Sequence, residues 1–421
     1  MYQGLRSKSN ISDTFLGRNS VAPLCNYIYS DSLQTKPLEN TMFINNWYVA
    51  CIADEIEATP RRVRILAHNF VLFRDDENNI HCLSDSCVHR GASLSLGKCQ
   101  NGGITCPQHG WEFNSNGKCT LIPAGTKTPT ETPKRARVPA YPVEEKYGLA
   151  FVFLGDLQED ERPAVPDIMP EWDTDDWHKG IIPRHKDINY NRMSENYNDP
   201  CHVHYVHEFA KWLPKGVTIV DQELNDRYIK AWHAAWNAAG KHSDSSGLMM
   251  EYNVISCVSR NTNYQPDYPP QIVTAFVTPI DDHNTQIHMI LLMPKNEVTA
   301  LDGSKVRGAT AEEHRMLVDM TRDQVMDEDY VVLSTTRPIK AAAPNEELLV
   351  ESDRTVAQVR KMTVAYGDQF GRINTEELSK LADTNITVIP CPAHKSDPKN
   401  WVHKRVPLIP GTAQANLKAA S

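Results

Sequence analysis

Between residues 42 and 155, short apolar runs alternate with turn sequences. The runs are rich in β-branched and aromatic residues, as buried strands are, and they cover 63–66, 70–73, 80–83 and 149–154. Residues 75–79 form a turn sequence between two of these runs. Glycine recurs between residues 91 and 125 too often for helices to form there. The pattern predicts a small all-β domain at 42–155.

A second pattern follows an acidic, proline-containing linker at 155–167. Apolar residues with helical spacing predict a helix near 200–213 and a longer one at 311–335. Between them lie strand-like runs at 217–220, 228–232, 249–257, 271–278 and 285–293. Strands between two helical blocks predict an α+β domain with an antiparallel sheet over residues 168–375.

The two ends of the 421-residue chain lie outside these patterns. Residues 1–41 are rich in Ser and Asn, and we expect a flexible N-terminal arm, although a cleaved organelle or plastid transit segment has a similar composition. Residues 376–421 are rich in proline with little periodicity, and we expect a C-terminal tail on the surface. The remaining length is sufficient for two domains, each with its own core.

Composition and charge narrow the class of protein. The net charge is −9 with acids and bases interspersed, which argues against a nucleic-acid partner, because such a partner calls for a basic face. No apolar run approaches the roughly 20 residues that span a bilayer, so no membrane span is expected. The 10 cysteines are scattered and too few for a disulfide scaffold. We therefore expect a reducing compartment, the cytoplasm.

Two short loops in the all-β region each carry one cysteine and one histidine. Cys87 and His89 form the first pair, Cys106 and His109 form the second, and a glycine follows each histidine closely. In a Rieske centre, two cysteines hold one iron of a 2Fe–2S cluster and two histidines hold the other. A structural zinc site also uses Cys and His, but zinc sites usually keep the two cysteines together and the two histidines together. The mixed order within each loop favours the iron–sulfur cluster.

A second group of candidate ligands begins at Asp199. His202, His204 and His207 follow it within one short segment. Asp199 before Pro200 also fits an ordinary helix N-cap with proline at the first helical position. On an ideal helix, His204 and His207 share a face, whereas residues 202 and 207 are splayed apart. Spacing alone therefore leaves His204 as an alternative metal ligand.

A mononuclear iron site of two histidines and one carboxylate needs an acid from another segment. The predicted helix at 311–335 offers Asp327, Glu328 and Asp329. The helical neighbours of Asp329 at three and four residues are all apolar: Val325, Met326, Val332 and Leu333. An unpaired carboxylate in that stripe would be costly, whereas a metal would stabilise it. We therefore predict Asp329 as the ligand and a solvated acidic face for Asp327 and Glu328.

The loop pattern resembles a known family. Cys87-x-His89-Arg90-Gly91 with Cys106-x-x-His109-Gly110-Trp111 is similar to the Rieske motif of ring-hydroxylating and related oxygenases. Rieske proteins of respiratory complexes carry two further cysteines, where this chain has Ala92 and Gln108. The difference favours the oxygenase branch. The resemblance implies a small all-β Rieske domain followed by an antiparallel-sheet, helix-grip (START-like) catalytic domain.

The second group carries the same resemblance. Asn196-x-x-Asp199-x-x-His202-x4-His207 is similar to the iron-binding motif of Rieske oxygenases. The resemblance implies that His202 and His207 are iron ligands. It also implies that Asp199 receives electrons from His109 of a neighbouring chain, so that the active protein is a homotrimer. His204 then has a supporting role.

The context of Asp329 resembles the branch that contains vanillate demethylases, pheophorbide oxygenase and toxin-tailoring oxygenases. Glu351-Ser352-Asp353-Arg354 also resembles a stretch of that branch. Pheophorbide-oxygenase-like members add a C-terminal Cys-x-x-Cys and a membrane segment, and neither is found here. We interpret Cys391 and His394, an isolated pair in the tail, as incidental rather than as a third metal site.

These features predict an oxygenase component that contains a 2Fe–2S cluster and a mononuclear Fe(II). It would use O2 to hydroxylate or demethylate a small organic substrate. Because the chain has no Gly-x-Gly-x-x-Gly nucleotide motif, a separate NAD(P)H-dependent reductase is expected, alone or with a ferredoxin. The alternatives are a non-catalytic Rieske electron carrier, a cis-dihydroxylating dioxygenase or a desaturase. Candidate pocket walls are Trp212, Tyr252 and Phe276.

Overall fold

The computed structural model describes residues 41–124, 132–210, 217–236, 242–300, 303–341, 347–382 and 384–412. Its N-terminal part is built from three small antiparallel sheets. The first sheet has the order β1 (Asn46–Ile52), β11 (Leu149–Leu154) and β10 (Val143–Lys146). The second has the order β2 (Arg61–Ile65), β3 (His68–Arg74), β4 (Ile80–Ser84) and β9 (Ala140–Tyr141). The predicted strands of this region are confirmed.

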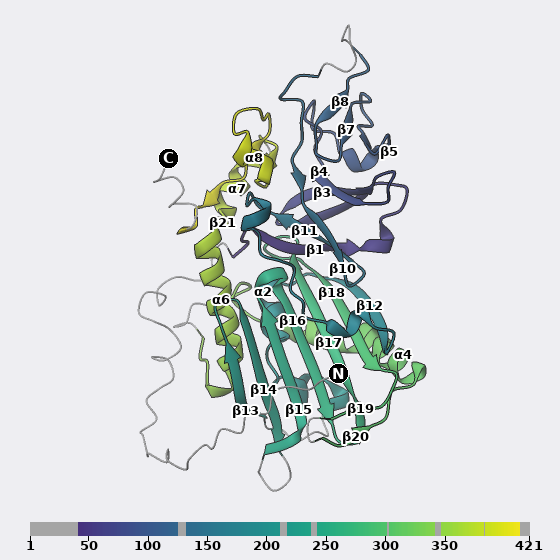
Figure 1. The fold of residues 1–421 in the computed structure, drawn as a ribbon. Helices are drawn as coiled ribbons and strands as arrows, with labels where there is room; N and C mark the ends of the chain where they lie inside the picture. The colour runs from purple at the N-terminus through teal and green to yellow at the C-terminus, as the bar shows by residue number, and fades with distance from the viewer. Residues whose placement is uncertain are drawn as a thin grey trace.

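The third N-terminal sheet supports the cysteine–histidine loops. It has the order β5 (Lys98–Gln100), β6 (Gly103–Thr105), β7 (Glu112–Asn114) and β8 (Cys119–Leu121). Asn101 and Gly102 join β5 to β6 with φ angles of 54° and 65°, which a two-residue hairpin turn requires and which Asn-Gly adopts readily. In Figure 1 this sheet lies at one end of the molecule.

A seven-stranded antiparallel sheet forms the other end of the molecule (Figure 1). Its strands, in spatial order, are β12 (Trp177–Lys186), β18 (Thr285–Pro294), β17 (Tyr268–Pro279), β16 (Val258–Gln265), β15 (His242–Asn253), β14 (Tyr228–Trp236) and β13 (Val217–Leu224). Five of them confirm the predicted runs, although the run at 249–257 leaves the sheet after Asn253. The sheet and its helices confirm the predicted α+β class.

Two strands of this sheet were not predicted. β12 was missed because it contains Gly180 and Pro183, residues that are typical of loops. The proline is tolerated because β12 lies at the edge of the sheet. β16 is polar along most of its length, so it has no apolar alternation to reveal it.

The helices are α2 (Tyr190–Asn196), α3 (Val203–Val206), α4 (Ala311–Met320), α5 (Met326–Leu333), α6 (Arg354–Phe370), α7 (Thr375–Leu381) and α8 (Pro392–Ser396). The prediction of one long helix at 311–335 is confirmed, with a π-helical turn between α4 and α5. The prediction of a helix at 200–213 is wrong in extent, because α3 ends where His207 adopts an extended backbone. Residues 211–213 lie outside the described residues. α2, α6, α7 and α8 were not predicted.

A continuous apolar core joins the first two N-terminal sheets to the large sheet. It runs from β1 and β11 through the inner strands of the large sheet to α2 and α6. Beside it, Arg360 of α6 donates to both carboxylate oxygens of Glu195 at 2.5 and 2.9 Å, which fixes α2 against α6. A smaller core lies under β3 and β6–β8. No helix of the described residues is long and apolar enough to cross a membrane.

The C-terminal segment packs on the N-terminal sheets rather than lying only on the surface. The Tyr141 hydroxyl donates to the Ile389 carbonyl at 2.8 Å, and Ile389 and Cys391 are fully buried. Its short strands are β21 (Arg372–Ile373), β22 (Thr387–Val388), β23 (Lys404–Arg405) and β24 (Leu408–Ile409). A separate hairpin before α4 pairs β19 (Val298–Thr299) with β20 (Lys305–Val306). The segment therefore belongs to the folded body.

Candidate metal centres

The two cysteine–histidine loops have the same backbone hydrogen bonds. In the first, Cys87 N donates to Ala92 O at 2.8 Å and Gly91 N donates to Cys87 O at 2.8 Å. In the second, Cys106 N donates to Trp111 O at 2.8 Å and Gly110 N donates to Cys106 O at 3.0 Å. Both glycines have left-handed φ angles, +74° and +70°, which glycine adopts without strain. The sequence therefore builds one loop geometry twice.

The four predicted cluster residues come together at the tips of these loops. Cys87 and Cys106 are 1% and 2% exposed, whereas His89 and His109 are exposed. The two imidazole centroids lie 4.6 Å apart, and His89 stacks on Trp111 at 4.7 Å. Burial, with the neighbouring Cys106 thiol, raises the pKa of Cys87 to about 12. Buried thiolates need a strong positive partner, so two inner cysteines and two outer histidines fit an iron–sulfur cluster.

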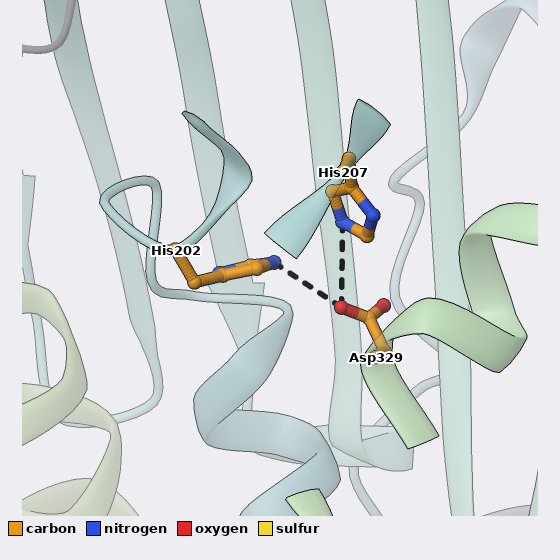
Figure 2. Close-up of side chains that lie close together, drawn as sticks. All are labelled: His202, His207 and Asp329. Atoms are coloured by element: carbon orange, nitrogen blue, oxygen red, sulfur yellow. Dashed lines mark ion pairs between the residues drawn. The ribbon is translucent and has the colours of Figure 1, made fainter. Parts of the chain in front are cut away.

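The second constellation gathers side chains from two elements that are distant in sequence. His202 precedes α3, His207 follows it, and Asp329 lies in α5. His202 Nε2 is 3.5 Å and His207 Nε2 is 3.3 Å from Asp329 Oδ1, as Figure 2 shows. The early end of α3 removes the helical splay between residues 202 and 207. His204 lies on α3, is buried and is not one of the three converging ligands.

The three converging side chains have room for a cation between them. Their ligand atoms all lie within 4.8 Å of one another. Asp329 is 5% exposed, and its Oδ1 has no hydrogen-bond partner among the described residues. A buried carboxylate oxygen of this kind is costly unless a positive charge meets it. Two imidazoles and one carboxylate are the donor set of non-haem iron sites with open coordination positions.

Asp199 lies on the outer side of His202. Its Oδ2 is 3.6 Å from His202 Nδ1, and its side chain is 29% exposed. Burial alone would lower the pKa of His202, but the carboxylates of Asp199 and Asp329 raise it above the usual value. Asp199 therefore connects the outside of the chain to one of the converging imidazoles.

The three consecutive acids of α5 have three different partners. Asp327 pairs with Lys186 at 2.5 Å, Asp329 faces the two imidazoles, and Glu328 Oε2 accepts from His207 Nδ1 at 2.9 Å. Burial alone would raise the pKa of Glu328, but hydrogen bonds from Gln324 and His207 hold it below the usual value. The prediction of a solvated face is therefore wrong for Glu328.

Sequence reasoning missed Glu328 because helical neighbours within α5 do not reveal contacts from another segment. One signal was present, since a metal-bound histidine usually donates its second ring N–H to a carboxylate. The π-helical turn Thr321–Val325 lies directly before these acids. Such turns are frequent at functional sites.

A cavity of about 500 Å³ opens beside the three converging side chains. Its apolar lining residues include Val203, Phe209, Leu248, Val273, Met289, Leu317, Met320, Val325 and Met326. Tyr252 and Phe276, which were predicted as pocket walls, are instead packed in the main core. Trp212 lies outside the described residues.

Comparison with known proteins identifies the family. The Rieske 2Fe–2S domain model matches residues 46–142. The oxygenase subunit of vanillate O-demethylase from Pseudomonas sp. (strain HR199 / DSM 7063) is 34% identical over 270 residues, which are 56% of this chain and 73% of that protein. The chain belongs to the Rieske non-haem iron oxygenases. Within this family it is an oxygenase component, and its cofactors are a 2Fe–2S cluster and a mononuclear iron.

Other Rieske oxygenases match shorter parts of the chain. The oxygenase component of dicamba O-demethylase from Stenotrophomonas maltophilia is 33% identical over 171 residues, 40% of this chain and 48% of that protein. The structure of dicamba monooxygenase bound to dicamba has the same fold, with a TM-score of 0.62, 21% identity and coverage of 77% of this chain and 98% of that chain. The chain thus spans about half the length of some relatives and most of others.

Proposed function

We propose that this Rieske oxygenase uses O2 to hydroxylate or demethylate a small organic molecule, with electrons from a separate NAD(P)H-dependent reductase, alone or through a ferredoxin. The observation that carries the proposal is the convergence of His202, His207 and Asp329 beside a cavity of about 500 Å³. Monooxygenation or demethylation is favoured over dihydroxylation and desaturation, because the relative with 73% coverage is a vanillate O-demethylase subunit.

The chain's own residues would have the following roles. Cys87, His89, Cys106 and His109 hold the cluster. His202, His207 and Asp329 hold the iron, with Asp329 as the single anionic ligand. When bound, the iron would supply O2 activation, and the cluster would pass on the electrons that the reductase delivers. Glu328 keeps a proton on His207 Nδ1 at 2.9 Å, so that Nε2 presents its lone pair to the metal. The apolar lining limits the access of water to the reacting centre.

Electron delivery is proposed to occur between chains. The β5–β8 sheet and the large sheet lie at opposite ends of one molecule (Figure 1), and no contact within the described residues joins His109 to Asp199. His109 is exposed, and the Asp199 side chain is partly exposed. A homotrimer would bring the His109 of one chain to the Asp199 of the next. This arrangement is what the family resemblance implies.

The domain limits are part of the same proposal. We assign the Rieske domain to 42–155, which contains the matched residues 46–142, and the catalytic domain to 168–375. The arm at 1–41 and the tail at 376–421 flank them. The 9 cysteines of the described residues form no disulfide, which supports a reducing compartment such as the cytoplasm.

The test is metal analysis of the purified protein together with one variant. The wild type should contain one iron beyond those that match its acid-labile sulfide. Asp329→Ala should lose that iron and keep the visible absorption of the cluster. Asp327→Ala, which changes an acid two residues earlier that is paired with Lys186, should keep both centres. A chelator should likewise remove turnover of a small-molecule panel with a surrogate reductase, and added Fe(II) should restore it.

A wild type with cluster iron alone would support the electron-carrier alternative. An extra iron that persists in Asp329→Ala would contradict the ligand assignment.

A further inference from the structure

One wall of the cavity is formed by side-chain amides. Asn261 and Asn263 alternate along β16 and line the cavity, and Gln271 of β17 lies opposite Asn263 in the strand register. Asn263 Nδ2 and Gln271 Oε1 are 3.5 Å apart, so the pair is loosely coupled. Alternate residues of a strand face the same side of a sheet. The polar character that concealed β16 in the sequence therefore belongs to the cavity.

Asn261 has an unmet hydrogen-bond acceptor at this wall. Its Nδ2 donates to the Tyr197 carbonyl at 2.9 Å, which fixes the orientation of the amide. Its Oδ1 is buried and has no partner among the described residues. A buried acceptor of this kind is normally satisfied by a donor. A ligand that supplies an N–H group would satisfy it.

The part of the cavity lining that comes from the helices is largely apolar. It is formed by side chains of α4, the π-helical turn and α5: Leu317, Met320, Val325 and Met326. Methionine side chains adapt to the shape of a ligand better than branched ones do. The cavity therefore has one hydrogen-bonding side and one apolar, adaptable side.

The charges around the cavity disfavour an anion. The carboxylates in its lining are Asp199 and Asp329, and the described lining residues include no lysine or arginine. The two positive charges of a ferrous ion would be balanced by these two carboxylates. Burial lowers the pKa of His233, another lining residue, to about 4, so this imidazole is neutral near pH 7. A carboxylate substrate would be desolvated here without a cationic partner.

We propose that the substrate is a non-anionic small molecule with amide-like N–H and C=O groups, held by Asn261, Asn263 and Gln271. The rest of the molecule packs on Leu317, Met320 and their neighbours. This inference rests on the proposed function, because it concerns the same cavity, and it adds the chemical class of the substrate.

The inference is tested by binding rather than by turnover. Isothermal titration of the iron-loaded protein without O2 would compare three probes with the same ring and methoxy group: 3-methoxybenzamide, 3-methoxybenzoate and 3-methoxytoluene. A hydrogen bond contributes about 1 kcal/mol, so the amide should bind about tenfold more tightly than the toluene when one or two such bonds form. The benzoate should bind at least about a hundredfold more weakly than the amide, since its charge is left unpaired.

Variants locate the preference on the amide wall. Gln271→Leu and Asn263→Leu should each remove most of the preference for the amide over the toluene. Gln286→Leu is the matched control, because Gln286 lies on the neighbouring strand β18 and its side chain bonds to the Ile287 carbonyl at 3.2 Å rather than lining the cavity. This control should keep the full preference.

The inference is overturned if the benzoate binds as tightly as the amide, if the amide shows no binding up to its solubility limit, or if both wall variants keep the wild-type preference. Metal analysis separates these outcomes from a failure of the proposed function. A wild type that holds the mononuclear iron but prefers the benzoate refutes the substrate class alone. A wild type that lacks that iron refutes the function.

Discussion

Glu328 provides the sharpest test of the proposed mononuclear iron site at α5. Its carboxylate accepts from His207 Nδ1 at 2.9 Å and from Gln324 Nε2 at 2.8 Å, and its side chain is 19% exposed. We expect removal of this carboxylate to weaken iron binding although Glu328 does not touch the metal. The reason is that His207 would lose the partner that fixes its ring and its tautomer.

The magnitude follows from what each substitution leaves behind. Loss of a carboxylate that supports a metal-bound histidine typically costs 10- to 100-fold, as an order of magnitude, in metal affinity. Glu328→Gln keeps an oxygen acceptor of nearly the same shape and loses only the charge, so we expect about a tenfold loss. Glu328→Ala leaves His207 Nδ1 without a partner in a largely buried position, so we expect about a hundredfold loss.

The assay is competition for Fe(II) between the protein and a chelator of known affinity under anaerobic conditions. The ratio of mononuclear iron to cluster sulfide gives the occupancy. Asp327→Asn is the matched control, because it removes the same charge from the same helix. Asp327 pairs with Lys186 at 2.5 Å and not with His207. It should change the affinity less than either Glu328 variant.

Wild-type affinity in Glu328→Ala would refute the reasoning. Equal losses in Glu328→Gln and Asp327→Asn would also refute it, because the effect would then come from the net charge of α5 and not from the contact with His207.

Two further predictions concern the cluster loops and the core. Gly91→Ala should lower the cluster content, measured as visible absorbance and sulfide, because φ is +74° and the new Cβ would lie 2.6 Å from Ile386 Cδ1. The control Gly303→Ala, where φ is +86° and nothing lies within 4 Å of the new Cβ, should keep the full cluster content. Full cluster content in Gly91→Ala would contradict this prediction. Burial lowers the pKa of His288 from 6.5 to about 3, so the unfolded state takes up its proton first and stability falls as the pH drops below 6.5. At pH 5 this effect lowers the free energy of unfolding by about 2 kcal/mol. In urea titrations, the wild type should therefore lose about 2 kcal/mol more between pH 7 and pH 5 than His288→Gln does. An equal loss in the two proteins would contradict this prediction.

The apolar strands and the cysteine–histidine loops were readable because both are local. Residues 149–154 are apolar throughout, and the structure buries all of them in β11. Each loop is closed by hydrogen bonds between residues no more than five apart, such as Cys87 N to Ala92 O. The helical neighbours of Asp329 likewise indicated burial, and Asp329 is 5% exposed.

The missed elements were those whose sequence reflects a distant partner. β16 is polar because part of it lines the cavity, and β12 tolerates Pro183 because it is an edge strand. The helix near residue 200 was overextended because its end at His207 serves the convergence with Asp329, which helical spacing does not encode.

The sequence by itself determined the two cysteine–histidine loops, the α+β class and the burial of Asp329, since each follows from the pattern of residues along the chain. Helical spacing left His204 open and the family motif favoured His202 and His207; the tertiary structure shows these two meeting that acid. Only the tertiary structure revealed that Glu328 contacts His207 from 121 residues further along the chain. Such contacts depend on strand register and on the packing of α5 beside α3. These are properties of the whole fold, and no short segment carries them.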